Sequence, residues 1–166
     1  MKLAIFDDYR LGVVSPDGQR IVDVTGALPW PHDPDPVGAG WWVRLCRDFA
    51  HLRPRLEEAA ATGAPRSIGE VRLRPPVLNP GKIVACAINY DAHEAEMYDV
   101  QRRVGGSMEA WLFEFDVFLK APSSIVGPQD AVKLPAGPVS EGREVHHESE
   151  LAFVIGRGGV GIPEER

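Results

Sequence analysis

This 166-residue sequence has few cysteines, no cluster of basic residues and no long apolar run. Each of these features excludes a class of protein. The two cysteines, Cys46 and Cys86, lie in apolar stretches without CxxC spacing, so we interpret them as reduced, buried thiols. No apolar run approaches the roughly 18 residues that a membrane helix requires, and acidic residues follow the N-terminus too early for a signal peptide. Lysines and arginines are scattered in a chain of net charge -6. We therefore expect a cytoplasmic protein that binds neither membranes nor nucleic acid.

The chain has enough apolar residues to form a core, since 44% are hydrophobic and 25% are charged. Its first segment is typical of a hairpin. Apolar runs at 3–6 and 11–14 are separated from a return strand at 21–25 by turn formers at 15–18. The pattern predicts three short strands before residue 26.

A helix is expected next, because apolar residues recur at intervals of three and four from Trp42 to Leu56. Pro54 should bend or restart it, and the helix should end near residues 62–65. Alternation at 70–74 predicts a strand, and the prolines that follow place a domain boundary near residue 76. We thus expect a small β-rich domain at 1–76 with one helix, and a second domain at 77–166.

The second domain carries four apolar runs that predict strands, with helical spacing after the first. KIVACAINY at 82–90 and ELAFVIG at 150–156 are continuous runs, as in strands that are buried on both faces. The shorter runs are 117–120 and 132–135, and residues 91–98 are spaced as a helix. The expected fold class is α+β and mostly β.

Glu148 and Glu150 directly precede or begin the last of these strands. Side chains alternate along a strand, so both carboxylates should lie on one face, about 6.6 Å apart along the chain. Two carboxylates beside a buried strand are costly unless a positive charge neutralises them, and a hard divalent cation would do so. The other interpretation is an exposed edge at which both face water. His146 falls on the same face, as a capping residue or a ligand.

His93 and Glu96 are three residues apart in the predicted helix and should share a face. A carboxylate beside an imidazole orients the ring and raises its basicity, as in a general base for water. A surface ion pair has the same spacing. Lys120 closes an apolar strand before a serine turn, where it could meet an anionic substrate or extend into solvent.

Gly156 to Gly161 match the GxGxxG pattern of dinucleotide-binding loops. That loop should open a helix at once, whereas Pro163 follows here after only one residue. We interpret it as a glycine-rich turn, which leaves a nucleotide-binding module as a distant alternative.

The order of these motifs resembles the fumarylacetoacetate hydrolase family. A KIVACAINY strand leads into NYxxHxxE, then into FLKxPSS, and finally into HHExELAFVIGR, between residues 82 and 157. The N-terminal hairpin is similar to the small β-rich domain that precedes the catalytic domain in many members. The resemblance implies mixed β-sheets rolled around a metal site, in a homodimer.

The resemblance also implies roles for single residues. Glu148 and Glu150 would be ligands of Mg²⁺, Mn²⁺ or Ca²⁺, and His93 with Glu96 would activate water. Lys120 would be the motif lysine near the active site. Three further residues are candidate substrate contacts: Tyr90 in NYxxHxxE, Ser123 in FLKxPSS, and Arg102 in the densest basic pair of the chain.

The implied reaction is metal-dependent hydrolysis of a C–C bond in a small 2-oxo or 1,3-dicarbonyl acid of the acylpyruvate type. Decarboxylation or isomerisation in aromatic-acid catabolism would use the same site. Family members continue to a third acidic ligand that we do not find before Arg166, so we expect this chain to be a piece of a longer or split protein. A non-catalytic fragment that retains the fold is the remaining alternative.

Overall fold

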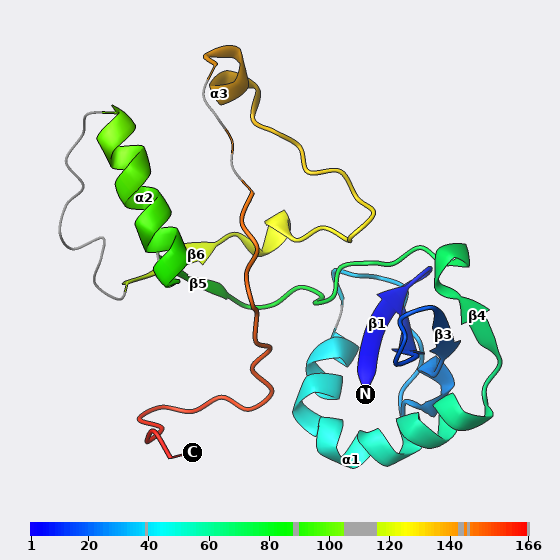
Figure 1. Cartoon of the computed structure of the whole chain (residues 1–166). Helices are drawn as coiled ribbons and strands as arrows, with labels where there is room; N and C mark the ends of the chain where they lie inside the picture. The colour runs from blue at the N-terminus through cyan, green and yellow to red at the C-terminus, as the bar shows by residue number, and fades with distance from the viewer. Residues whose placement is uncertain (39, 88–89, 105–115, 143–144, 146, 166) are drawn as a thin grey trace. The chain divides into compact units, whose positions relative to one another are not determined.

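The computed structural model describes residues 1–38, 40–87, 90–104, 116–142, 145 and 147–165. Its backbone divides into two compact units. The first comprises Met1–Asn79 and Val126–Arg166, and the second comprises Pro80–Ile125. Figure 1 shows the elements of both, which are described here one unit at a time.

A four-stranded antiparallel sheet forms the centre of the first unit, in the order β1-β2-β3-β4. The first three strands confirm the predicted hairpin and return strand, and a turn that contains Gly18 at φ 74° joins the second to the third. The strands are β1 (Lys2–Phe6), β2 (Arg10–Val14), β3 (Arg20–Asp23) and β4 (Pro65–Ser67).

The sheet is buried on both faces. Ile5 and Phe6 are neighbours on β1, so they point in opposite directions, and each is only 1% exposed. Ile5 packs with Leu11 and the helix α1 (Gly40–Thr62), whereas Phe6 packs with Ile21 and Val71. Two cores of unequal size therefore hold this unit together.

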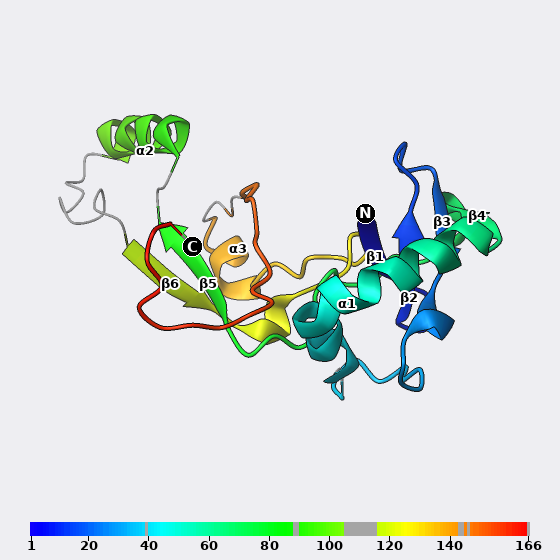
Figure 2. The ribbon, with the colours of Figure 1, turned by 90° about the horizontal axis from the view of Figure 1, so that it is seen from below.

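Helix α1 lies across one face of the sheet (Figures 1 and 2). It confirms the predicted apolar stripe and continues unbroken through Pro54, rather than restarting there. The helix ends at Thr62, as the following glycine indicated. Its buried residues are Trp41, Trp42, Leu45, Leu52 and Leu56.

The strand predicted at 70–74 is reduced to one isolated bridge, between Phe6 and Leu73. Residues 68–70 form a 3₁₀ turn instead, and the edge strand β4 lies just before it. Asp7 explains the difference, because it turns the chain away at φ 46° and ends β1 after five residues. A longer ladder has no partner strand there.

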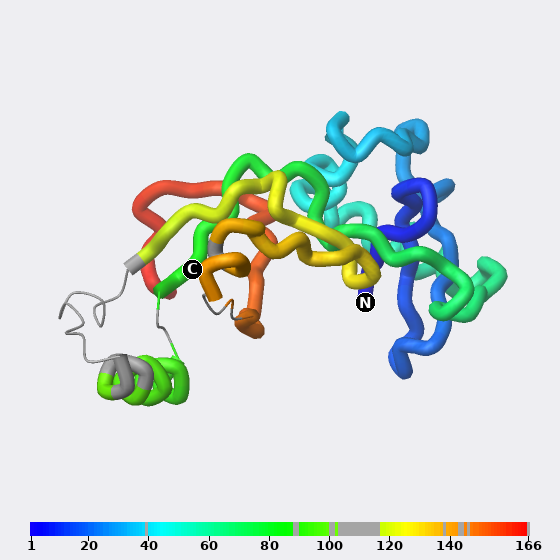
Figure 3. Tube along the Cα trace, turned by 90° about the horizontal axis from the view of Figure 1, so that it is seen from above, coloured from blue at the N-terminus to red at the C-terminus, as the bar shows by residue number. Residues whose placement is uncertain are grey.

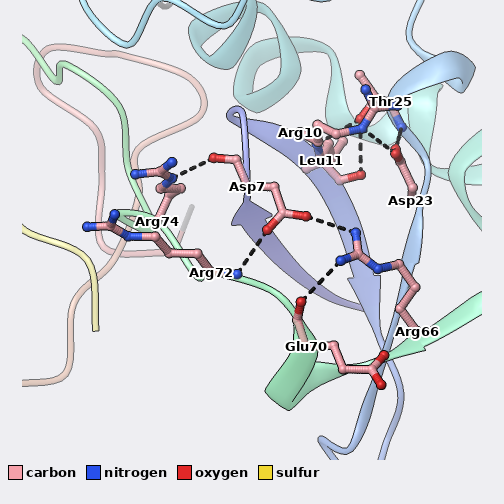
Figure 4. Close-up of polar contacts among 9 residues, drawn as sticks. All are labelled: Asp7, Arg10, Leu11, Asp23, Thr25, Arg66, Glu70, Arg72 and Arg74. Carbon is pink, nitrogen blue, oxygen red and sulfur yellow. Dashed lines mark hydrogen bonds and ion pairs between the residues drawn. The ribbon is translucent and has the colours of Figure 1, made fainter. Parts of the chain in front are cut away.

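Asp7 is held in place by hydrogen bonds that it donates and accepts, in place of a longer β ladder (Figure 4). The Asp7 N–H donates to the carbonyl of Arg72 at 2.8 Å, and the Asp7 carboxylate accepts from the Arg72 N–H at 2.9 Å. The same carboxylate accepts from the guanidinium of Arg66 at 2.8 Å, and the Arg74 guanidinium donates to the Asp7 carbonyl. This network fixes the segment that leaves the N-terminal sheet.

Residues 126–130 are bonded to the same segment, within the same unit. The guanidinium of Arg72 contacts the carboxylate of Asp130 at 2.7 Å, and the Leu73 N–H donates to the Gln129 side chain at 2.8 Å. The Gly127 N–H donates to Asp130 at 2.8 Å and closes this turn. We call residues 72–74 and 127–130 the polar clasp.

The second unit contains the antiparallel pair β5 (Ile83–Ala87) and β6 (Asp116–Lys120) and the helix α2 (Asp91–Val104). These elements confirm the strands predicted in KIVACAINY and at 117–120, and the helix predicted at 91–98. A 3₁₀ turn at Pro122–Ser124 follows β6.

The strands predicted at 132–135 and 150–156 are wrong. Both segments lack regular secondary structure, and a short helix α3 (Ala136–Ser140) lies between them (Figure 1). The Cα trace in Figure 3 follows the path of the same part of the chain. Their apolar composition indicated strands, but a strand also requires a neighbouring strand, and neither sheet among the described residues includes these segments. Leu151 and Phe153 are accordingly 73% and 80% exposed.

The α+β class is as expected from the sequence. Both cysteines are free and half-buried, and burial raises the pKa of the Cys46 thiol. Within the described part of the chain, no helix has the length and apolarity needed to cross a membrane.

Candidate functional site

The clearest pair of candidate residues lies in the first turns of α2. His93 Nδ1 is 3.3 Å from Glu96 Oε2, so the two side chains share a face as their spacing predicted. Asp91 and Glu94 occupy the first turn, where negative charge complements the helix dipole and supports this helix start. The His93 side chain is 30% exposed and that of Glu96 is 66% exposed, so water reaches both.

This arrangement suits a general base. When Nδ1 carries the proton and donates it to Glu96, the opposite ring nitrogen, Nε2, presents a lone pair. The carboxylate then holds the ring in one orientation and stabilises the imidazolium that forms after proton uptake.

Lys120 is the last residue of β6 and lies opposite Ile83 in the ladder. Its ammonium lies 5.5 Å from the centroid of the Phe118 ring. Ser123 is exposed in the 3₁₀ turn that follows, where the neighbouring Ser124 hydroxyl donates to the carbonyl of Ala121 at 2.7 Å. The lysine and serine of FLKxPSS therefore lie at the end of one strand and in the next turn.

The other two candidate substrate contacts lie on or beside α2. Tyr90 precedes the helix, and its carbonyl accepts a hydrogen bond from the Glu94 N–H at 3.0 Å. Arg102 forms an ion pair with Asp99 at 2.7 Å, and both side chains are mostly exposed. A nearby carboxylate reduces the attraction of Arg102 for a substrate anion.

Glu148 and Glu150 are exposed in a segment without regular secondary structure. The strand that was expected to place both on one face is absent here, so alternation does not fix their relative direction. Among the described residues, no group of three or more His, Cys, Asp and Glu side chains is arranged to hold a metal ion. His146 lies outside the described residues.

The chemistry of this donor pair nevertheless fits a hard divalent cation. Two carboxylates one residue apart offer the oxygen ligands that Mg²⁺, Mn²⁺ and Ca²⁺ prefer, and their exposure leaves them accessible. Such ions take six or more ligands, so Glu148 and Glu150 would supply only part of the shell.

Comparison with known proteins identifies the family. The model of the fumarylacetoacetate (FAA) hydrolase C-terminal domain matches residues 82–166, about half of the chain. The chain belongs to this family. The matched residues include His93, Glu96, Lys120, Glu148 and Glu150.

The relatives of this chain within the fumarylacetoacetate hydrolase family include hydrolases and tautomerases. A maleylpyruvate hydrolase of Aquipseudomonas alcaligenes is 34% identical over all of this chain and 56% of its own length. A mitochondrial oxaloacetate tautomerase of Xenopus laevis is 38% identical over 94% of this chain and 43% of its own length. The chain thus spans about half the length of these relatives.

A crystal structure of the same fold supports the assignment. Maleylpyruvate hydrolase from Sphingobium sp. SYK-6, in complex with manganese(II) and pyruvate, is 37% identical with a TM-score of 0.63. The match covers 84% of this chain and 44% of that one.

The contacts of Lys120 with Phe118 and of Arg102 with Asp99 were not predicted from the sequence. The spacing of the residues indicates both. Phe118 lies two residues before Lys120 on a strand, so both must point to one face. Asp99 lies three residues before Arg102 on a helix, which is the spacing of an ion pair.

Proposed function

We propose that this protein takes part in metal-dependent hydrolysis of a C–C bond in a small 2-oxo acid of the acylpyruvate type. The observation that supports this most directly is the His93–Glu96 pair, because hydrolysis requires a general base that takes a proton from water. Similarity to maleylpyruvate hydrolase over the whole chain agrees with it.

Each residue has a proposed task in this reaction. His93 Nε2 takes a proton from water, and the hydroxide that results adds to the substrate carbonyl carbon distal to the 2-oxo acid end. Glu96 holds the ring and stabilises its positive charge. Lys120 binds the substrate carboxylate, and Tyr90, Arg102 and Ser123 are proposed to contact the rest of the substrate.

Glu148 and Glu150 are proposed to hold the divalent cation, Mg²⁺, Mn²⁺ or Ca²⁺, together with ligands from elsewhere. When bound, the cation would supply Lewis acidity for negative charge on the keto oxygen. The proton on His93 then returns to the departing carbon, so that acid and base are regenerated in one cycle.

Activity of the protein with Mn²⁺ tests these assignments. His93→Gln should lower the rate of pyruvate release from an acylpyruvate by about 10²–10⁴-fold, which is the usual contribution of a general base. Glu148→Ala should abolish metal-dependent turnover, and the exposed Glu164→Ala is its matched control. Unchanged turnover in Glu148→Ala would refute the ligand assignment, and an absence of saturable Mn²⁺ binding would favour a non-catalytic fragment.

A tautomerase is the second candidate, because oxaloacetate tautomerases are among the relatives. Loss of oxaloacetate enol absorbance without pyruvate release would favour it. In that case the His93–Glu96 pair would move the substrate proton itself, so Glu96→Gln should slow the loss of enol absorbance while no pyruvate is released.

The protein is further proposed to be a cytoplasmic homodimer. Sedimentation velocity distinguishes a dimer from a monomer by mass, and a monomer at micromolar concentration would contradict the dimer.

A further inference from the structure

The face of the β5–β6 ladder that carries Lys120 also carries an aromatic ring. Residues 118 and 120 are two apart on β6, so their side chains project in the same direction. The Lys120 Nζ atom lies 5.5 Å from the Phe118 centroid, within the roughly 6 Å over which a cation is attracted to a ring face.

The strand opposite faces this pair with side chains of unequal size. Ala85 is the cross-strand partner of Phe118 and Ile83 is that of Lys120, so a single methyl group faces the ring from β5 while the larger Ile83 lies opposite the lysine. The bulkier Val84 and Leu119 form a cross-strand pair on the other face. A small ligand could therefore approach the ammonium from the Ala85 side.

Among the described residues, Lys120 forms no ion pair with a carboxylate, and its ammonium contacts the Phe118 ring. A lysine side chain has four flexible carbons and loses much freedom when it is fixed. A ring that already holds the ammonium reduces the loss that remains when an anion binds.

We propose that Phe118 is a positioning residue, whose ring holds the Lys120 ammonium on the Ala85 face for the carboxylate of a small 2-oxo acid. This inference depends on the proposed function, because it takes Lys120 as the carboxylate contact. The inference adds Phe118 to the proposed site, as a residue that orients the Lys120 side chain without contacting the reacting atoms.

Nuclear magnetic resonance of the protein tests the contact itself. The ε-methylene protons of Lys120, assigned with Lys120→Ala, should be shifted upfield by the ring current of Phe118. The shift should vanish in Phe118→Leu and be retained in Phe118→Trp. Ordinary shifts of the Lys120 ε-methylene protons in the unmodified protein would overturn the inference before any Phe118 variant is compared.

Calorimetric titration with pyruvate in the presence of Mn²⁺ tests the consequence. Phe118→Leu should weaken pyruvate binding about two- to fivefold, the range that corresponds to an exposed cation–π contact, and leave Mn²⁺ affinity unchanged. Phe118→Trp should retain affinity. Leu119→Ala, on the opposite face of the same strand, is the matched control and should change neither affinity.

The outcomes separate this inference from the proposed function. Pyruvate binding that depends on Lys120 but is unchanged in Phe118→Leu would overturn the role of Phe118 alone. A protein that binds Mn²⁺ but no pyruvate would overturn Lys120 as the carboxylate contact, and the inference with it. Equal losses in Phe118→Leu and Leu119→Ala would indicate a merely structural effect and would also overturn it.

Discussion

Asp23 at the end of β3 illustrates how single residues of the N-terminal unit are tied together. Its carboxylate accepts a hydrogen bond from the Thr25 N–H at 2.9 Å and contacts the Arg10 guanidinium, and the Thr25 hydroxyl accepts from the buried Leu11 N–H at 2.9 Å. Burial by itself would raise the pKa of Asp23, but the hydrogen bonds from Thr25 and Arg10 outweigh it and hold this pKa below its usual value.

This direction fixes the sign of a pH effect. The folded pKa of Asp23 lies below the unfolded value of about 3.9, so its stabilisation is fully present above that pH and is lost as the pH falls through the folded pKa. Asp23→Asn should cost about 1 kcal/mol at pH 7 and make the decline of Tm below pH 4 shallower. Thermal melts at several pH values measure both effects. Asp8→Asn, at an exposed position, is the control, and an equal change there would contradict the prediction.

At the scale of elements, the end of α1 approaches the sheet so closely that a side chain does not fit. A Cβ added to Gly63 would lie 2.4 Å from Val22 of β3 and 2.9 Å from the Ala59 carbonyl. Gly63→Ala should therefore move the helix from the sheet and lower the free energy of unfolding by about 1–3 kcal/mol.

Gly26→Ala is the matched control for this substitution, because a Cβ there meets nothing within 4 Å. It should be neutral or slightly stabilising, since alanine restricts the unfolded chain. Urea denaturation of both variants measures the difference. Equal midpoints would show that α1 and β3 can separate at no cost.

Elements with local signals were the ones that sequence predicted well. The spacing of Leu45, Leu52 and Leu56 marks α1, and the alternating or apolar runs of the N-terminal strands lie beside their own turns. The run at 150–156 has a stronger apolar signal, yet it forms no strand, because pairing depends on residues distant in the chain and composition does not encode them.

In the candidate site, too, local spacing predicted one arrangement correctly and could not predict another. The contact between His93 and Glu96 follows from helical spacing alone and was predicted. The common face of Glu148 and Glu150 required a paired strand, so it could not follow from spacing. The role of each of these residues stays a prediction until the variants above are measured.

At the scale of the whole molecule, burial is distributed unevenly along the chain. Among the residues that the structure describes, those of the hydrophobic core lie between Ile5 and Leu78, whereas most of the exposed large apolar side chains follow residue 80. Amides in β1, β2 and α1 should thus exchange with deuterium only through global unfolding, and those at 147–165 should exchange within seconds to minutes. Mass spectrometry of peptic peptides measures this. Equal protection at 150–156 would show that this segment pairs with a strand after all.

The polar clasp has a topological consequence. Arg72 and Asp130 are 58 positions apart in the chain but are joined at 2.7 Å, so the chain leaves the first unit and returns to it at neighbouring points of that unit. Closing so long a loop costs entropy that grows only slowly with length, by about 0.6 kcal/mol for each doubling. We therefore expect insertions or deletions between residues 80 and 125 to leave the Arg72–Asp130 contact of the first unit unchanged.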